Sequence, residues 1–415
     1  MSEGSLEAPT RHVIPWEDES YYDEAALDAE LHRVFDICHG CRRCFNLCDS
    51  FPRLFDLIDE SPTGELDSVD SKDFKPVIDA CTLCDMCFMT KCPYVPPHEF
   101  NLDFPHLMLR ARAIEFRKGE TSLPDKELAK TDRNGKLATL VSGPANWATS
   151  SKNVLTRPIL QAVADIDARA DLPTYASETF EEQVAGSGIA INKDAPGYGR
   201  KATLYATCFV NFNTPGVGMA TQAVLAHNGV EVDVEYPGCC GMPKLENGDL
   251  AGVAAQARLV SEALEAAIDA GRDIIALTPS CALMMKFEWP LILPNDSKVK
   301  KLAAATYDIA EYVVEISKKQ GLAPGLGELE GPVAMHFACH SRAQNQGPKA
   351  AEMLRLIPGA KVSVVERCSG HGGKWGMFTK NFDVGIKIGT PAGRALAKVE
   401  PAHIVSECPL AGVHI

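Results

Sequence analysis

The chain has 415 residues, 46% of them hydrophobic, and a net charge of -14 from 41 basic and 55 acidic side chains. A chain of this length exceeds what one hydrophobic core usually organises, so we expect two or three domains. The acidic balance argues against nucleic acid as a partner, because its backbone is recognised by basic surfaces. Neither a signal-peptide pattern nor an apolar run near the ~20 residues that span a bilayer is present. This predicts a cytoplasmic protein without a membrane span, for which any contact with the inner membrane would be made through a partner.

Residues 1–30 form an acidic N-terminal segment. Seven acidic residues and no basic residue lie between positions 17 and 30. A run of like charges usually stays in solvent. We therefore expect a solvated arm ahead of the first domain.

Eight of the 15 cysteines stand in two short runs with fixed spacing. The first run has the pattern C-x2-C-x2-C-x3-C and the second C-x2-C-x2-C-x4-C-P, which is the spacing of two-cluster ferredoxins. In such proteins the fourth cysteine of each run binds the cluster of the other run. The pattern predicts one 4Fe-4S cluster on Cys38, Cys41, Cys44 and Cys92, and a second on Cys48, Cys81, Cys84 and Cys87.

Disulfides and zinc are weaker interpretations of these runs. A reducing cytosol disfavours disulfides. Zinc sites usually use two C-x2-C pairs, so a third cysteine at the same interval has no place in them. Apolar residues recur at helical intervals over residues 25–37 before the first run and 104–119 after the second. We predict an α-helical two-cluster ferredoxin domain over residues 31–115.

Residues 116–200 carry no recognisable chemistry. Turn-forming and charged residues dominate this section, and residues 150–166 show a helical pattern. We interpret it as a linker with one helical segment.

From residue 201 the sequence changes to short β-rich runs that each end in cysteine. Three runs lie in residues 201–330 and three in 331–415, and equivalent cysteines are 131, 129 and 127 residues apart. This regularity indicates an internal duplication. The cysteines are Cys208, Cys239, Cys240 and Cys281 in the first repeat, and Cys339, Cys368 and Cys408 in the second, degenerate repeat. Seven residues follow Cys408, so we expect no helix to cover the last strand.

Helical patterns lie between these strands, as in residues 253–271, whose apolar side chains share one face ahead of Gly271. Alternating strands and helices predict parallel sheets, which bind ligands at the carboxyl ends of their strands. We therefore expect the four cysteines of the first repeat to hold a third iron-sulfur cluster or zinc, rather than to pack as buried apolar groups. In the second repeat Ser369 replaces one cysteine of the pair. His371 is the candidate fourth ligand there, and His340 is a weaker one.

The order of these parts resembles a known family. The motifs CFVNFN, CCGMP, SCALMMKFEWP and HFACH, together with the cysteines above, are similar to the duplicated cysteine-rich CCG domain of heterodisulfide reductase catalytic subunits. A ferredoxin run followed by two CCG domains is similar to the iron-sulfur subunits of anaerobic glycerol-3-phosphate dehydrogenase and of glycolate oxidase. The resemblance implies an electron-transfer subunit that takes electrons from a dehydrogenase-type or other redox partner. It implies delivery to a quinone or another acceptor.

Two departures from the family pattern bear on the chemistry. Met284 and Ala411 stand where the family has the last cysteine of each repeat. Family members that reduce disulfides use five cysteines per repeat, so the resemblance implies electron conduction here and no catalytic residue in this chain. Two alternatives stay open: a stand-alone disulfide or thiol reductase with a reactive cluster in the repeats, and a ferredoxin with a zinc-stabilised docking module. We find no G-x-G-x-x-G fingerprint and no P-loop, which predicts neither flavin nor nucleotide binding.

Overall fold

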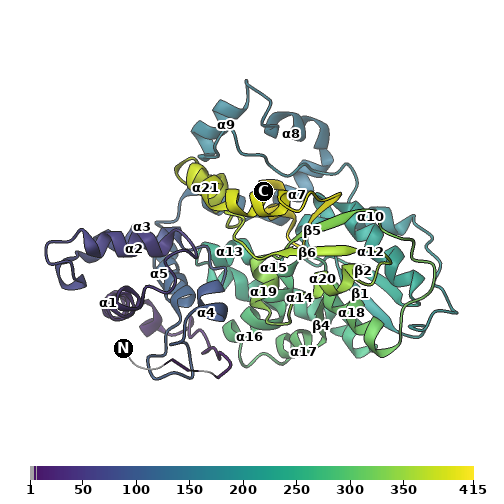
Figure 1. Ribbon diagram of the computed structural model, residues 1–415, viewed down its shortest axis with the longest axis horizontal. Helices are drawn as coiled ribbons and strands as arrows, with labels where there is room; N and C mark the ends of the chain where they lie inside the picture. Colours follow the sequence, from purple (N-terminus) through teal and green to yellow (C-terminus); the bar gives the residue numbers. More distant parts are fainter. Residues whose placement is uncertain (1–3, 6) are drawn as a thin grey trace.

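The chain folds into an N-terminal helical domain packed against two α/β repeats. The computed structural model describes residues 4, 5 and 7–415. Figure 1 shows the helical domain, in purple and blue, on one side of the two repeats, which run from teal to yellow. Among the described residues, no helix is long and apolar enough to cross a bilayer.

The helical domain is built around a core of aromatic rings. Phe51 and Phe104 pack with ring centroids 4.7 Å apart, and Phe35 and Phe74 with centroids 5.0 Å apart. Helix α1 begins after Asp23, whose carboxylate caps the first turn. The elements are η1 (Glu19–Tyr22), α1 (Glu24–Cys41), α2 (Ser50–Asp59), η2 (Leu66–Ser68), η3 (Ser71–Phe74), α3 (Lys75–Ala80), α4 (Met86–Thr90) and α5 (Phe104–Lys118). The two helices predicted on either side of the cysteine runs are α1 and α5.

The first repeat contains a four-stranded parallel sheet. Its order is β2-β1-β3-β4, and Thr203 of β1 lies opposite Asp233 of β2 and Ile274 of β3. The strands are β1 (Lys201–Tyr205), β2 (Glu231–Glu235), β3 (Asp273–Ala276) and β4 (Thr306–Asp308). The three strands predicted to lead into cysteines are β1, β2 and β3, and their parallel arrangement confirms the predicted topology. The edge strand β4 has only three residues, too few for a periodic pattern.

Helices cover both faces of this sheet because its strands alternate apolar side chains between two cores. Ile274 belongs to the core that contains α14, and Ile275 to the core formed with α12 and α18. Helix α14 ends just before Gly271, whose φ of 78° lets the chain reverse, and this confirms the predicted helix. The helices are α11 (Cys208–Phe212), α12 (Pro215–His227), α13 (Met242–Glu246), α14 (Leu250–Asp269), α15 (Pro279–Leu283), the π-helical turn η4 (Met284–Glu288), α16 (Trp289–Ile292), α17 (Ser297–Ala305) and α18 (Ile309–Lys319).

The second repeat has the same strand order as the first. Its parallel sheet is β6-β5-β7, so in both repeats the first strand lies between the second and the third. This agreement supports the predicted duplication. The elements are β5 (Pro332–His336), α19 (Cys339–Ala343), α20 (Lys349–Leu354), β6 (Lys361–Val365), η5 (Trp375–Met377), α21 (Thr379–Ala397), β7 (His403–Ser406) and α22 (Pro409–His414). The expectation that no helix follows the last strand is wrong: Pro409, at the first helical position, opens α22.

The section interpreted as a linker is structured. It contains α6 (Leu123–Leu128), α7 (Thr131–Leu140), α8 (Ser142–Thr149), α9 (Arg157–Ala164) and α10 (Phe180–Ala185). Phe180 of α10 is fully buried in the core that α12 and α18 form on the first sheet. Helix α7 approaches α11 so closely at Gly135 that a Cβ there would overlap the ring of Phe212. Short helices of this kind depend on tertiary contacts, which a linear pattern does not reveal.

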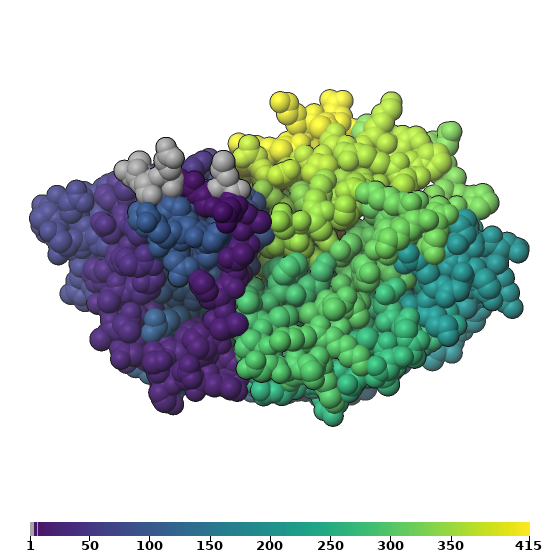
Figure 2. Space-filling view, turned by 90° about the horizontal axis from the view of Figure 1, so that it is seen from below, coloured from purple at the N-terminus to yellow at the C-terminus, as the bar shows by residue number. Residues whose placement is uncertain are grey.

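The acidic N-terminal segment divides into two parts. Residues 24–30 form the start of α1, where Leu27 is buried. Upstream of them, residues 7–16 follow the boundary between the helical domain and the first repeat, and Figure 2 shows this dark purple chain beside the green atoms. The N-H of Thr10 donates to the carbonyl of Pro96 at 3.0 Å, and that of Ile14 to the carbonyl of Leu291 at 2.9 Å. Residues 7–16 therefore contact both domains, while the acidic residues from Glu17 to Glu24 are exposed to solvent.

We expect Phe180→Ala to lower the free energy of unfolding by about 3–5 kcal/mol, because it removes a fully buried ring from the first sheet. Denaturant titration followed by circular dichroism measures the change. Leu123→Ala is the control, since Leu123 is 75% exposed and its loss should cost less than about 0.5 kcal/mol. Equal effects of the two variants would contradict the packing of α10.

Candidate metal centres

The first set of predicted ligands, Cys38, Cys41, Cys44 and Cys92, lies together in the helical domain. Cys38 and Cys41 belong to the last turn of α1, Cys44 follows in a turn, and Cys92 comes just after α4. All four line one cavity whose remaining wall is mostly apolar. Burial, and then the thiolates of Cys92, Cys44 and Cys41, raise the pKa of Cys38 well above its usual value. The fourth cysteine of the second run thus lies with the first run.

The second set, Cys48, Cys81, Cys84 and Cys87, lies where α2 and α4 begin. Burial, and then the thiolates of Cys81, Cys84 and Cys48, raise the pKa of Cys87 well above its usual value. The fourth cysteine of the first run therefore lies with the second run. Cys44 is a further charged neighbour of Cys87, so the two sets adjoin.

Two left-handed residues shape the loop that carries three of these cysteines, residues 81–87. Leu83 and Asp85 have φ values of 49° and 62°, which residues with a side chain rarely adopt. The resulting turns point backbone N-H groups at sulfur. Burial raises the pKa of Cys84 to about 12, and the N-H of Met86 opposes this rise by hydrogen bonding to the sulfur. Hydrogen bonds to cysteine sulfur are one of the features that set the potential of an iron-sulfur cluster.

The four cysteines of the first repeat meet at the carboxyl ends of β1, β2 and β3. Cys208 opens α11 after β1, Cys239 and Cys240 follow β2, and Cys281 lies in α15 after β3. The Sγ atoms of Cys208 and Cys239 are 3.9 Å apart. Hydrogen bonding with Cys208 and Cys240 lowers the pKa of Cys239 well below its usual value. The parallel topology thus brings three separate segments to one point.

Asp132 of α7 is a residue of this site that the sequence analysis missed. Its Oδ2 accepts the N-H of Cys239 at 3.3 Å, and its Oδ1 accepts the hydroxyl of Tyr236. Gln256 of α14 donates to the carbonyl of Cys239 at 2.9 Å. These bonds fix the turn that carries the cysteine pair. No local pattern marks Asp132, because only the packing of α7 against α11 brings it to the site.

The second repeat brings Cys339, Cys368, Cys408 and His371 into one region. Cys339 opens α19 after β5, while Cys368 and Cys408 follow β6 and β7. Burial, and then the thiolates of Cys84, Cys368 and Cys408, raise the pKa of Cys339 well above its usual value. Cys368 is the one exposed side chain among the 15 cysteines, all of which the structure describes. The site is therefore more open than that of the first repeat.

The hydrogen bonds of His371 favour a donor role over the predicted ligand role. Its Nδ1 accepts the N-H of Gly373 at 2.9 Å, and its Nε2 lies 3.7 Å from the Sγ of Cys408. Burial lowers the pKa of His371 to about 3, so the ring is neutral and carries one proton. With Nδ1 accepting, that proton resides on Nε2 and faces the sulfur. The weaker candidate, His340, has Asp85 and Glu288 of other elements as charged neighbours.

The second-repeat cysteines lie between the other sets. Helix α19 packs against α4 of the helical domain and α15 of the first repeat. Burial and the nearby thiolate of Cys368 both raise the pKa of Cys84. Burial and the nearby thiolate of Cys281 raise the pKa of Cys408 in the same way. Within residues 4, 5 and 7–415, no three His, Cys, Asp or Glu side chains are grouped tightly enough to hold a single metal ion. The second-repeat cysteines thus adjoin both the Cys48 set and the first repeat.

A cavity opens where the helical domain meets the second repeat. Its wall includes Cys81 and Arg112 on one side, Glu246 from α13, and Lys374 and Trp375 on the other. Burial raises the pKa of Glu246 to about 7, although Lys374 and Arg112 oppose this rise.

Two parallel sheets of equal strand order, each with cysteines at its carboxyl edge, define a duplicated cysteine-rich α/β protein. The sequence model of the cysteine-rich domain family CCG matches residues 202–286 and 333–415, which are the two repeats. The chain belongs to this CCG family, as the resemblance in the sequence predicts.

The relatives of this chain include a component of a metabolic enzyme. One subunit of anaerobic glycerol-3-phosphate dehydrogenase from Escherichia coli (strain K12) is 28% identical over 305 residues, which cover 73% of this chain and 74% of the relative. Lactate utilization protein A of Bacillus cytotoxicus is 30% identical over 186 residues, covering 42% of this chain and 73% of the relative. The same protein of Geobacillus sp. (strain WCH70) is 29% identical over 189 residues, again covering 42% of this chain and 73% of the relative.

We expect His371→Ala to retain the metal content of the wild type, because Nδ1 accepts the N-H of Gly373 and leaves the proton of the ring on Nε2, which faces Cys408. Metal content per chain is measured by inductively coupled plasma mass spectrometry after anaerobic purification. Cys240→Ala serves as the positive control and should lose metal. A loss in His371→Ala as large as that in the control would show that the imidazole is a ligand.

We expect Glu246→Gln to stabilise the protein increasingly as the pH rises. A carboxyl group whose pKa is raised by folding stabilises the protein fully below its unfolded pKa, here about 4.5. That contribution is lost as the pH rises through the folded pKa, here about 7. The gain over wild type should reach at most about 3 kcal/mol at pH 8 and shrink toward pH 5. Thermal unfolding at both pH values measures it, with the exposed Glu120 of the same cavity changed to Gln as the control. A gain that is independent of pH would contradict the raised pKa.

Proposed function

We propose that this chain is an iron-sulfur electron-transfer subunit of an oxidoreductase complex. One observation carries the proposal: the two N-terminal cysteine runs exchange their fourth members, so that Cys92 lies with the first run and Cys48 with the second. This exchange is the arrangement of two-cluster ferredoxins. A tetrahedral zinc site gives no reason for it, because four cysteines of one run would suffice.

The proposed cofactors are two 4Fe-4S clusters in the helical domain and a third iron-sulfur cluster in the first repeat. When bound, such a cluster accepts and releases single electrons. The cysteine sets provide four thiol ligands at each position, and mostly apolar side chains line the cavity of the Cys38 set. In the first repeat the lowered pKa of Cys239 favours the thiolate form in which cysteine binds metal. These features fit the proposed groups.

The adjoining cysteine sets support conduction over catalysis. The Cys38 set adjoins the Cys48 set through Cys44 and Cys87. The second-repeat cysteines adjoin both the Cys48 set and the first repeat, with α19 packed against elements of both. A series of adjoining redox centres moves electrons through a protein, whereas a single reactive centre would need no such series.

The names of the relatives support a role in a larger complex. One of them is a subunit of anaerobic glycerol-3-phosphate dehydrogenase. We infer that a dehydrogenase-type or other redox subunit delivers electrons to this chain. A quinone or another acceptor, reached through a partner, then receives them.

We expect anaerobically purified full-length protein to contain about twelve iron atoms per chain, four for each of three clusters. Iron, sulfide and zinc analysis and electron paramagnetic resonance after dithionite reduction measure this. About eight irons with one or two zinc ions would support the docking-module alternative instead. Folded protein without iron or a reversible redox signal would overturn the proposal.

Two variants locate the clusters in this experiment. Cys38→Ser should remove iron from the helical domain, and Cys240→Ser should remove about four irons while leaving the helical-domain signals intact. Cys368→Ser is the comparison from the second repeat. If Cys240→Ser left the iron content unchanged, the third cluster would have to be abandoned.

A further inference from the structure

An N-terminal strap, residues 7–16, lies between the helical domain and the first repeat, as Figure 2 shows. Backbone hydrogen bonds connect it to both sides, from Thr10 to Pro96 in the helical domain and from Ile14 to Leu291 in the first repeat. The indole N-H of Trp16 adds a bond to the carbonyl of Ile292 at 2.8 Å. The strap thus spans the boundary that electrons would have to cross.

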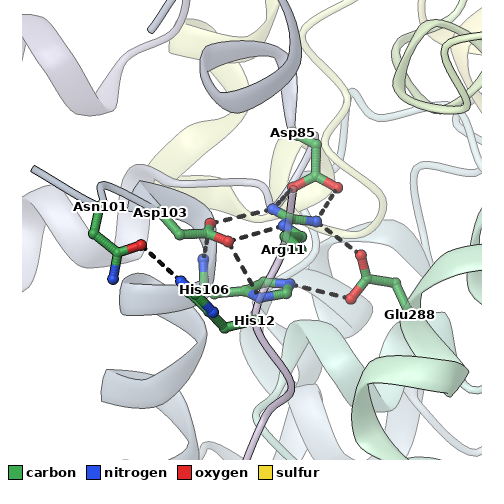
Figure 3. A network of polar contacts seen from close by, with 7 residues as sticks. All are labelled: Arg11, His12, Asp85, Asn101, Asp103, His106 and Glu288. Carbon is green, nitrogen blue, oxygen red and sulfur yellow. Dashed lines mark hydrogen bonds and ion pairs between the residues drawn. The ribbon is translucent and has the colours of Figure 1, made fainter. Parts of the chain in front are cut away.

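Arg11 of the strap lies at this boundary and forms ion pairs with three carboxylates (Figure 3). Its guanidinium holds Asp85 through two bonds of 2.7 and 2.9 Å and Asp103 through bonds of 2.9 and 3.2 Å. A further bond of 2.9 Å reaches Glu288. The Cζ atom lies 4.4 Å from the centroid of the Phe88 ring. With 12% of its side chain exposed, Arg11 is nearly enclosed by these partners.

The three carboxylates come from three different elements. Asp85 lies in the loop between Cys84 and Cys87, and it adopts a left-handed conformation there. Asp103 caps the start of α5. Glu288 ends the π-helical turn η4, which directly follows the helix that carries Cys281. One cation therefore connects the proposed second cluster loop with the first repeat.

Removal of the cation would leave these carboxylates in an unstable arrangement. Asp85 and Glu288 are buried, with 6% and 4% of their side chains exposed. His106 also bridges Asp103 and Glu288, at 3.4 and 3.2 Å, but it does not contact Asp85 in this network. An unpaired buried carboxylate is costly, so Asp85 would turn toward water and draw its loop with it.

We propose that Arg11 is a positioning residue for electron transfer: it fixes the loop of the second cluster against the first repeat and supplies positive charge beside that cluster. The inference rests on the proposed iron-sulfur function. Electron tunnelling falls steeply with distance, so a displaced loop slows transfer between the domains. Positive charge near a cluster favours its reduced form, so Arg11 also raises the potential of the second cluster.

The test uses full-length protein with Arg11→Gln and Arg11→Lys, prepared anaerobically. Redox titration followed by electron paramagnetic resonance gives the potentials, and flash photoreduction gives the rate at which electrons spread from the helical domain to the repeats. Arg11→Gln should shift the potential of a helical-domain cluster to more negative values and slow the spreading at least tenfold. Arg11→Lys should keep the potential near that of the wild type, because it keeps the positive charge. It should still slow the spreading of electrons, because an ammonium group cannot make the paired hydrogen bonds of a guanidinium.

Arg117→Gln is the matched control. Arg117 also pairs with a carboxylate of the N-terminal region, Glu19 at 2.7 Å, and lies 4.4 Å from the ring of Tyr22, but this contact is exposed. Identical potentials and rates in Arg11→Gln and Arg117→Gln would overturn the role of Arg11. If Arg11→Gln does not retain its clusters, the Arg11→Lys variant decides the question. A rate of electron spreading equal to that of the wild type in Arg11→Lys would then also overturn the role of Arg11. Absence of clusters from the wild type would instead overturn the proposed function.

Discussion

The convergence of thiols from distant segments onto buried points is the constraint on which this structure depends. Burial and neighbouring sulfurs hold the pKa values of Cys38, Cys48 and Cys87 well above their usual range, so these side chains resist ionisation in the protein alone. A bound cation relieves both effects, because it replaces the lost hydration and screens one thiolate from the next. Binding of the proposed clusters would therefore be coupled to folding of the cysteine loops, and each set unites segments that are far apart in the chain.

The domains that hold these sets are integrated rather than merely adjacent. A single apolar core extends from Phe35 in the helical domain to Val253 in α14 of the first repeat. Arg11 adds directed charge pairing at the same boundary. Apolar burial provides most of the cohesion but little directional precision, whereas a guanidinium held by several carboxylates specifies an orientation. The combination holds the cysteine sets of the two domains at constant separation, which the proposed electron transfer requires.

Duplication has produced two repeats with one topology and different chemistry. In the first repeat, four cysteines meet and Asp132 supports the turn of the cysteine pair. In the second, Ser369 takes the place of one cysteine, His371 faces Cys408 as a hydrogen-bond donor, and Cys368 is exposed. The second repeat nevertheless packs against both the helical domain and the first repeat through α19. A repeat that has lost a cysteine thus still contributes structurally, because it fills the space between its neighbours.

The sequence by itself determined the elements whose signals are local: the two ferredoxin-type runs, the six strands that lead into cysteines, their duplication, and the long helix ending before Gly271. These rest on spacing and periodicity, which are fixed by covalent order. It did not determine the roles of Arg11 and Asp132, the folding of residues 116–200, or the donor orientation of His371. Those were decided by tertiary structure. Arg11 and Asp132 acquire their partners only when segments separated by 70 residues or more come together, and His371 meets Cys408 across 37 residues. A charge in a polar stretch looks solvated until packing encloses it.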